Sequence, residues 1–267
     1  MISINDEIFK RFGTVQRARG CFLYTKKGVR LTDLYREGGR AILGWGSSSA
    51  FTMFKDVLSR GLTGSFKTES DGRLTKAVSE LFGSERIVFT YNSLSKALKA
   101  AISYSRDGIT IWKPWRNKEE FAASKESLPC VIFAPPLPWT DSIYVLAIDP
   151  SLKDRPVDNP ETIRPVQDCL NAPLKTALTR SIYNLIKAQK EMKESDWFIY
   201  DTYLIPYFER KGPYLFPKVP EEKYEEFVLH CLDCNLVLSP NYNTPSIVPF
   251  GADKGVFSLL KKNPFSF

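Results

Sequence analysis

The chain has 267 residues, 43% of them hydrophobic and 25% charged, which is enough for a hydrophobic core that needs no disulfide staples. Its formal net charge of +7 would favour anionic partners if the charge were concentrated. Pairs such as Lys26-Lys27 and Lys261-Lys262 are spread along the chain, so the sequence predicts a mildly basic surface and disfavours nucleic acid as a partner.

The N-terminal stretch from Met1 to Gly13 carries Asp6, Glu7 and Lys10 and has no apolar core, so it does not read as a secretory signal. No apolar window reaches the length of a membrane span. The odd number of cysteines, five, favours reduced thiols over a disulfide framework. We therefore expect a cytoplasmic protein that does not bind a membrane.

The predicted elements form a β-rich N-terminal part, an alternating strand and helix part, and a C-terminal part of helices and short strands. Apolar spacing and turn residues predict, in chain order, a hairpin over 20–31, helices over 50–60 and 73–81, strands over 86–91, 108–112, 128–133 and 143–148, helices over 174–193 and 221–234, strands over 236–238 and 246–248, and a last helix over 256–261. The alternation predicts a parallel or mixed sheet, and the prolines of 150–168 predict a surface crossing.

The strand over 86–91 and the helix that follows it organise the rest of the chain. The strand is β-branched and aromatic, which is typical of a strand packed on both faces. Asn92 and Ser93 interrupt the run and are suited to cap a helix, whose predicted inner face carries Leu94, Leu98, Ala101 and Ile102. A helix N-terminus after a strand is where α/β sheets bind anions, so a small anionic ligand is one expectation here.

Three stretches of the sequence resemble the class-III branch of the pyridoxal phosphate (PLP) aminotransferases, including glutamate-1-semialdehyde aminomutase-like proteins. The first runs from Gly20 to Leu34 and on to Gly38-Gly39 and Gly44. The second is Glu80-Leu81-Phe82-Gly83 with the strand after it and Asn92-Ser93-Leu94-Ser95-Lys96-Ala97. The third runs from Gly212 to Pro249.

The resemblance implies the aspartate-aminotransferase fold. This would be a reduced α/β domain with a mixed sheet and flanking helices, together with a small α+β domain built from both termini. We expect an N-terminal segment and entry loop over 1–60, the α/β domain over 61–180, and the long helix with the C-terminal small domain over 181–267. Because members of the family are dimers, the resemblance also implies a homodimer.

The resemblance places a cofactor phosphate at the turn before the predicted helix, which implies Asn92, Ser93 and Ser95 as contacts. The family has a Gly where this chain has Leu94, whose side chain should hinder close approach of the backbone to a phosphate. Asp149 is the implied carboxylate for the pyridine nitrogen, although a turn former is an equally good interpretation of an Asp before a Pro.

PLP chemistry also needs a lysine that bonds the cofactor, and no lysine stands in the family's sequence context. Lys153 and Lys175 are nearest by chain order and read as surface lysines. His230-Cys231-x-x-Cys234 has too few partners for a zinc site, and its cysteine pattern fits a helix core. The sequence therefore assigns no catalytic residue and no metal ligand.

The function that the sequence favours is a non-catalytic, aminotransferase-like protein that acts as a binding or interaction module, with no cofactor, or PLP if any. Two alternatives stay open. One is a PLP-dependent aminotransferase or aminomutase with a relocated lysine, and the other is a basic module that binds nucleic acid.

Overall fold

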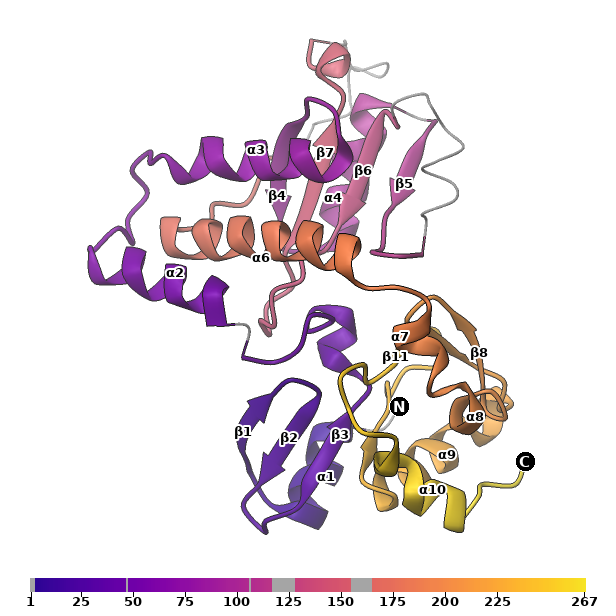
Figure 1. Cartoon of the computed structure of the whole chain (residues 1–267). Helices are drawn as coiled ribbons and strands as arrows, with labels where there is room; N and C mark the ends of the chain where they lie inside the picture. The colour runs from indigo at the N-terminus through magenta and orange to yellow at the C-terminus, as the bar shows by residue number, and fades with distance from the viewer. Residues whose placement is uncertain (1–2, 47, 106, 117–127, 155–164) are drawn as a thin grey trace. The chain divides into compact units, whose positions relative to one another are not determined.

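The computed structural model describes residues 3–46, 48–105, 107–116, 128–154 and 165–267, and the chain forms two compact units (Figure 1). The central unit is residues 48–190, and the terminal unit combines residues 1–47 with 191–267. These boundaries differ from the expected divisions at 60 and 180. The helix that begins at residue 48 packs within the central unit, where the hydroxyl of Ser49 and the side-chain amide of Asn184 exchange hydrogen bonds.

The central unit alternates helices and strands, as the sequence predicts. In chain order its elements are α2 (Ser48–Ser59), α3 (Ser70–Phe82), β4 (Ile87–Tyr91), α4 (Leu94–Tyr104), β5 (Ile109–Ile111), β6 (Cys130–Phe133), β7 (Tyr144–Ile148), the 3-10 helix η2 (Pro150–Leu152) and α6 (Ala172–Glu191), whose last residue belongs to the terminal unit. Most of the predicted crossing over 150–168 lies outside the described residues, which resume at Pro165.

The strands of the central unit form one mixed sheet in the order β4-β7-β6-β5. β7 is antiparallel to both of its neighbours, while β5 and β6 are parallel. The predicted mixed sheet is therefore confirmed. Among the described strands β4 pairs only with β7, so it is an edge strand, and its residues Ile87, Val88 and Phe89 are only partly buried. Helices α3 and α4 contact it from opposite sides, in agreement with the predicted packing on both faces.

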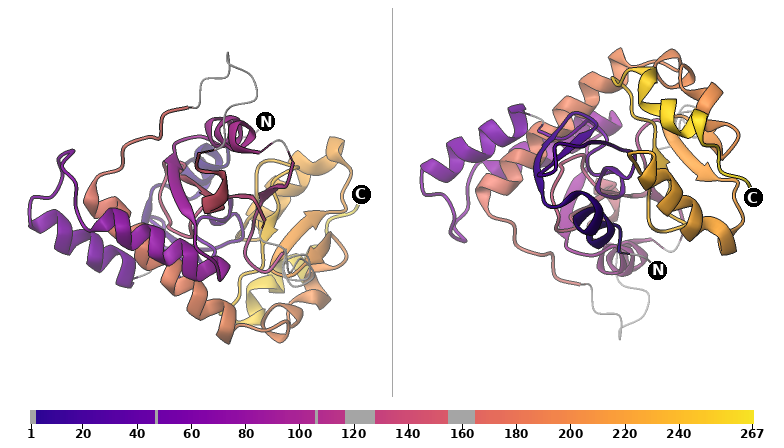
Figure 2. Two further views of the ribbon diagram at one scale, coloured as in Figure 1. Left: turned by 90° about the horizontal axis from the view of Figure 1, so that it is seen from above. Right: turned by 90° about the horizontal axis from the view of Figure 1, so that it is seen from below.

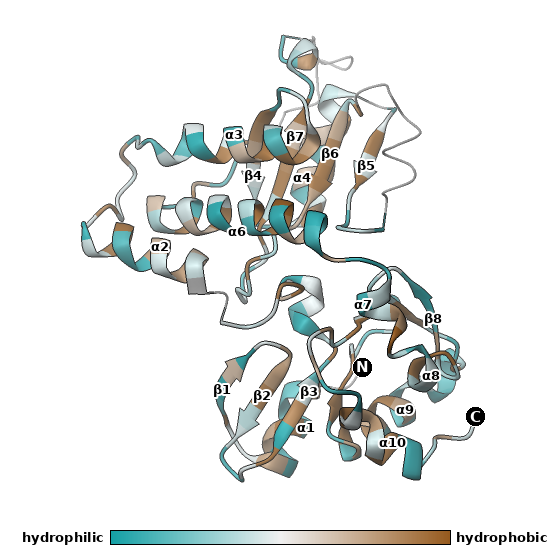
Figure 3. Cartoon of the chain, viewed as in Figure 1, coloured by the Kyte–Doolittle hydropathy of each residue, from teal (hydrophilic) through white to brown (hydrophobic). Residues whose placement is uncertain are grey.

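Helices cover both faces of this sheet. Figure 1 and the left view of Figure 2 show α4 on one side and α3 with α6 on the other. On the α4 side, the buried Ala97 and Ala101 pack with Ile132 and Leu146 of the sheet. The strands β6 and β7 are the hydrophobic centre of this unit, as their brown colour in Figure 3 shows.

The predicted inner face of α4 needs one correction. Leu94 and Leu98 pack against the buried cluster and Ala101 is fully buried, but the side chain of Ile102 is 52% exposed. The helix lies close to the sheet through the small residues Ala97, Ala100 and Ala101, which turns the next position outward.

The terminal unit is an α+β structure built from both ends of the chain. Its elements are α1 (Ile4–Phe12), β1 (Val15–Arg19), β2 (Phe22–Thr25), β3 (Arg30–Asp33), η1 (Arg36–Gly39), α7 (Ser195–Phe198), α8 (Asp201–Leu204), β8 (Phe208–Lys211), β9 (Tyr214–Pro217), α9 (Glu221–Asp233), β10 (Leu236–Val237), β11 (Ser246–Ile247), η3 (Lys254–Phe257) and α10 (Ser258–Lys262). The fold class expected from the sequence is thus confirmed, with α1, β1, α7, α8 and β8 as additional elements.

Two sheets organise the terminal unit. The first has the order β1-β2-β3-β10, and it joins the N-terminal hairpin to the C-terminal part because β10 pairs with β3 in parallel. The second has the order β11-β9-β8. Within the described part of the chain, no helix has the length and apolarity that crossing a membrane would require.

Candidate functional site

The turn between β4 and α4 has the local structure that its sequence predicts. Ser93 is extended, and its hydroxyl accepts a hydrogen bond from the backbone N–H of Lys96 at 3.3 Å, which is the geometry of a helix N-cap. Asn92 precedes it at the end of the strand, and Ser95 is exposed in the first turn of the helix. The turn therefore offers unpaired backbone donors and the positive end of the helix dipole.

A carboxylate from another part of the chain lies at this turn. Asp168 accepts a hydrogen bond from the backbone N–H of Asn92 at 2.7 Å and from Nζ of Lys96 at 3.0 Å. These bonds stabilise the charged form and hold the pKa of Asp168 below its usual value. An anion that belongs to the protein thus lies beside the N-terminus of α4, held by Asn92 and Lys96, while the hydroxyl of Ser93 caps the helix.

The backbone around Asp168 is fixed to the free edge of β4. The N–H of Asp168 donates to the carbonyl of Thr90 at 2.8 Å, and the Thr90 hydroxyl donates to the carbonyl of Asp168 at 3.0 Å. The hydroxyl of Tyr91 also donates to the carbonyl of Pro165 at 3.3 Å. Segment 165–169 therefore covers part of the edge strand, which positions the Asp168 carboxylate over the helix.

The four residues expected to contact a cofactor do not lie together. Asn92, Ser93 and Ser95 share the α4 turn, whereas Asp149 follows β7. Because β7 is antiparallel to β4, with Ile148 opposite Ile87, Asp149 lies at the other end of the sheet. Its carboxylate accepts from the N–H of Ser151 at 2.9 Å and caps η2, the turn-forming role that the sequence left as the alternative.

Leu94 does not fill the space before the turn. Its side chain packs against the buried cluster of Tyr91, Ala97 and the sheet below α4. Leu94 was expected to hinder the approach of an external anion, but its side chain belongs to the core. The group that lies at the turn is the carboxylate of Asp168.

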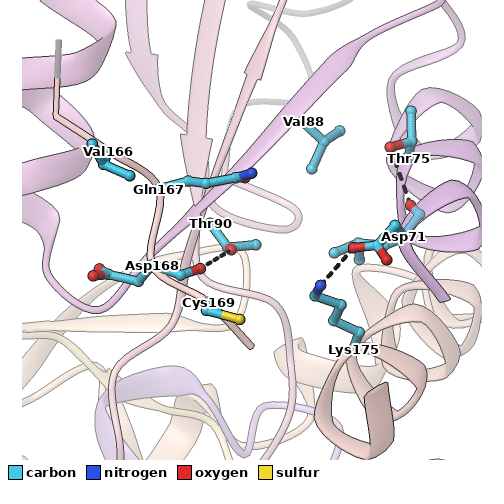
Figure 4. Close-up of a pocket in the computed structure, with 10 residues that line it drawn as sticks. Asp71, Thr75, Val88, Thr90, Val166, Gln167, Asp168, Cys169 and Lys175 are labelled. Carbon is cyan, nitrogen blue, oxygen red and sulfur yellow. Dashed lines mark hydrogen bonds and ion pairs between the residues drawn. The ribbon is translucent and has the colours of Figure 1, made fainter. Parts of the chain in front are cut away.

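A pocket of about 420 Å³ lies on the opposite side of segment 165–169 from the Asp168 carboxylate (Figure 4). Helix α3, strand β4, segment 166–169 and the first turns of α6 enclose it, all within the central unit. Its lining combines apolar with polar side chains: Asp71, Leu74, Thr75, Val88, Thr90, Val166, Gln167, Asp168, Cys169 and Lys175.

An ion pair forms one wall of this pocket. Nζ of Lys175 lies 2.5 Å from a carboxylate oxygen of Asp71, and the lysine side chain is only 18% exposed. Asn171 caps the start of α6 by accepting from the N–H of Leu174 at 3.0 Å, which positions Lys175 toward α3. Figure 4 shows Lys175 and Asp71 directed toward each other and the carboxylate of Asp168 directed away from them.

The other sequence candidates lie elsewhere. Lys153 is exposed after η2, at the same end of the sheet as Asp149. In the terminal unit, Cys231 is buried on α9, where burial raises the pKa of its thiol well above the usual value. The ring of His230 has the carbonyl of Asn263 within 2.8 Å. Among the described residues, no three His, Cys, Asp or Glu side chains are grouped to hold a metal ion.

Three residues of the turn and the pocket, Asp168, Asp71 and Cys169, were not expected from the sequence. Asp168 reaches Asn92 across 76 residues, and Lys175 reaches Asp71 across 104. No spacing rule connects residues that far apart. The one local indication of these residues in the sequence is that Gln167, Asp168 and Cys169 interrupt the apolar pattern just before α6.

Two curated proteins are similar to this chain along nearly its whole length. An uncharacterized protein of Treponema pallidum (strain Nichols) is 28% identical over an alignment of 307 positions, gaps included, that covers 93% of each chain. An uncharacterized protein of Borreliella burgdorferi is 26% identical over 257 residues, which cover 94% of this chain and 90% of the other. No protein-family model matches the sequence.

Solved structures of aminotransferases resemble the fold. Acetylornithine aminotransferase from Elizabethkingia anophelis superposes with a TM-score of 0.67 at 12% identity, covering 96% of both chains. The ornithine delta-aminotransferase of Plasmodium falciparum gives 0.68 at 10% identity, covering 98% of this chain and 97% of that one. An omega-transaminase from Sphaerobacter thermophilus gives 0.66 at 10% identity, with 93% and 90% covered. At these identities the likeness establishes the fold and leaves the chemistry open.

Proposed function

We propose that this protein is a non-catalytic relative of the class-III aminotransferases, reduced in length, that binds a small polar ligand and does not use PLP. The fold is that of a PLP-transferase, and function depends on the site rather than on the fold. The observation that carries the proposal is the position of the Asp168 carboxylate, 2.7 Å from the N–H of Asn92.

A cofactor phosphate does not fit the α4 turn while Asp168 is in place. The carboxylate already accepts from the N–H of Asn92 and from Nζ of Lys96, and it lies beside the first turn of α4, where a phosphate would be placed. A phosphate brought to the same donors would lie beside a second anion, and like charges in contact repel. The low pKa of Asp168 keeps that carboxylate charged at neutral pH.

The pocket between α3, β4 and α6 is the site that we assign to the ligand. Its hydroxyl groups (Thr75 and Thr90), the amide of Gln167 and the Lys175–Asp71 pair offer hydrogen bonds to a polar molecule. Leu74 and Val88 supply an apolar wall. A volume of about 420 Å³ suits a molecule of metabolite size.

The second candidate function is a PLP enzyme with a relocated lysine, which is favoured by the position of Lys175. Its side chain is mostly buried in the pocket wall, unlike that of the exposed Lys153. In this chain, however, the Nζ of Lys175 lies 2.5 Å from the Asp71 carboxylate, so it would have to leave this partner before it could bond a cofactor.

Titration with PLP separates the two functions. The purified protein is mixed with PLP, its absorbance spectrum is recorded, and borohydride is added before peptide mass spectrometry. We expect no absorbance band of a lysine adduct and no stoichiometric modification of one lysine. Lys175→Ala and Lys153→Ala are the matched variants. An adduct at a single lysine that disappears in the corresponding variant would establish the enzyme and overturn the non-catalytic assignment.

A further inference from the structure

The N-terminal sheet of the terminal unit concentrates basic charge that looked dispersed in the sequence. Segment 14–32 contains Arg17, Arg19, Lys26, Lys27 and Arg30 and no Asp or Glu, in a chain whose formal net charge is +7. The segment forms the antiparallel strands β1, β2 and β3. The expectation of an evenly basic surface therefore does not hold for this hairpin.

The register of the strands places three arginines and two aromatic rings on one face. Tyr24 pairs with Arg17 of β1 on one side and with Arg30 of β3 on the other. Two residues along β2, Phe22 pairs with Arg19. Because side chains alternate along a strand, these five residues share a face, whereas Leu31 takes the other and is fully buried. We call these five residues, Arg17, Arg19, Phe22, Tyr24 and Arg30, the arginine–aromatic face.

The side chains on this face contact one another closely. The guanidinium carbon of Arg30 lies 4.5 Å from the ring centre of Phe22, and that of Arg17 lies 5.6 Å from the ring centre of Tyr24. The two rings meet edge to face at 6.5 Å. The three arginines are exposed, and no carboxylate in the described part of the chain forms an ion pair with any of them.

We infer that the arginine–aromatic face binds single-stranded nucleic acid. Guanidinium groups neutralise phosphates, and guanidinium planes supported from below by the half-buried rings of Phe22 and Tyr24 stack on unpaired bases, so the face offers partners for both repeating parts of the strand. An anionic lipid surface or an acidic protein would use the charges and leave the rings without a role. The face belongs to the terminal unit, so the inference is independent of the ligand assigned to the pocket.

The test measures fluorescence anisotropy of a labelled oligothymidylate of about 15 nucleotides over a range of salt concentrations. With three phosphate contacts at about 0.7 each, the logarithm of the association constant should fall against log salt with a slope of about −2. Arg17→Gln should make that slope less steep by about 0.7. Tyr24→Leu should weaken binding at least about fivefold at every salt concentration and leave the slope unchanged.

The control is the double variant Lys261→Gln with Lys262→Gln, which removes two exposed charges of the same unit outside this face. It should bind the oligonucleotide almost as the unchanged protein does, and circular dichroism should show that each variant is folded. The inference is overturned if the protein does not bind at low salt, if the control loses as much affinity as Arg17→Gln, or if Tyr24→Leu has no effect. Binding to phosphatidylserine vesicles without binding to the oligonucleotide would also overturn it.

Discussion

The carboxylate of Asp168 accepts a hydrogen bond at 2.7 Å from the backbone N–H of Asn92, which precedes it by 76 residues. The contact joins the N-terminal end of α4 to segment 165–169, and the paired bonds between Thr90 and Asp168 continue it along the edge of β4. One residue thus stabilises a helix terminus and covers a sheet edge, two places where backbone groups otherwise lack partners. The turn therefore connects α4, β4 and segment 165–169 within the central unit.

Replacing Asp168 with Asn should destabilise the protein at neutral pH. The variant loses the charge that faces the Asn92 N–H and Lys96, and because both side chains are partly exposed the loss should cost about 0.5–1 kcal/mol in the free energy of unfolding. Because the pKa of Asp168 is lowered in the folded state, its stabilising charge is present above the usual aspartate pKa and is lost as the pH falls through the lowered value. Urea unfolding at several pH values measures this difference.

The difference between Asp168→Asn and the unchanged protein should therefore shrink in acid, as the pH falls below the usual aspartate pKa of about 3.9. Asp154→Asn is the matched control, because that carboxylate is exposed and lies on the same connection between β7 and α6. It should unfold within about 0.5 kcal/mol of the unchanged protein at all pH values. A constant difference for Asp168→Asn across the pH range would show that its carboxylate is not the source of the stability.

Cys169 should react with thiol reagents much faster than the other cysteines. It is the exposed cysteine on the rim of the pocket, whereas Cys21, Cys130, Cys231 and Cys234 are buried. Burial raises the pKa of Cys130 to about 11, so its reactive thiolate is scarce at neutral pH. Ellman's reagent should titrate one thiol rapidly in the folded protein and all of them after denaturation. A Cys169→Ser variant should lose the rapid phase, and a rapid phase that persists would contradict the assignment.

The elements predicted correctly from the sequence are those whose signals are local. Gly83 ends α3 with a φ of 68°, a left-handed conformation that favours glycine, and Ser93 caps α4 as its position predicts. The turn at Gly28, with a φ of 77°, joins β2 to β3 for the same reason. In each case the residue that determines the conformation lies within a few positions of the structure that it determines.

The sequence does not indicate the features that a distant segment decides. The β-branched sequence of β4 is the same whether the strand is central or at an edge, and only its pairing with β7 alone decides this. The direction of β7 then separates Asp149 from Asn92, a separation that no motif encodes. Asp168, which is 76 residues further along the chain than Asn92, reaches the α4 turn because segment 165–169 lies against the edge of β4.

The neighbouring residues Ala101 and Ile102 should differ strongly in how much a change of side-chain size lowers the stability of the protein. Ala101 is fully buried where α4 contacts the sheet, so Ala101→Leu has to displace packed neighbours and should cost about 1–3 kcal/mol in the free energy of unfolding. Ile102 is 52% exposed, so Ile102→Ala should change that free energy by less than about 0.5 kcal/mol. Thermal and urea unfolding of both variants provide the comparison, and a larger loss for Ile102→Ala would contradict the orientation of the helix.

Arg210 should be among the most sensitive positions of the terminal unit. Its Nε lies 2.5 Å and its Nη2 2.8 Å from the two carboxylate oxygens of Asp201, and both side chains are nearly buried. These hydrogen bonds, with a further one to Glu194, raise the pKa of Arg210 above its usual value. Arg210→Met removes the partner of a buried carboxylate and should cost about 3–5 kcal/mol in the free energy of unfolding.

A double variant separates the loss of the ion pair from the loss of packing. Arg210→Met combined with Asp201→Leu leaves no buried charge, and because replacing both partners of a buried pair is often close to neutral, it should recover much of the stability lost in Arg210→Met. Arg210→Lys keeps the charge but not the two-pronged geometry, so it should fall between the unchanged protein and Arg210→Met. Urea unfolding of the three variants measures these differences. If the double variant is less stable than Arg210→Met, the pair contributes through packing, and the assignment of its role to buried charge is wrong.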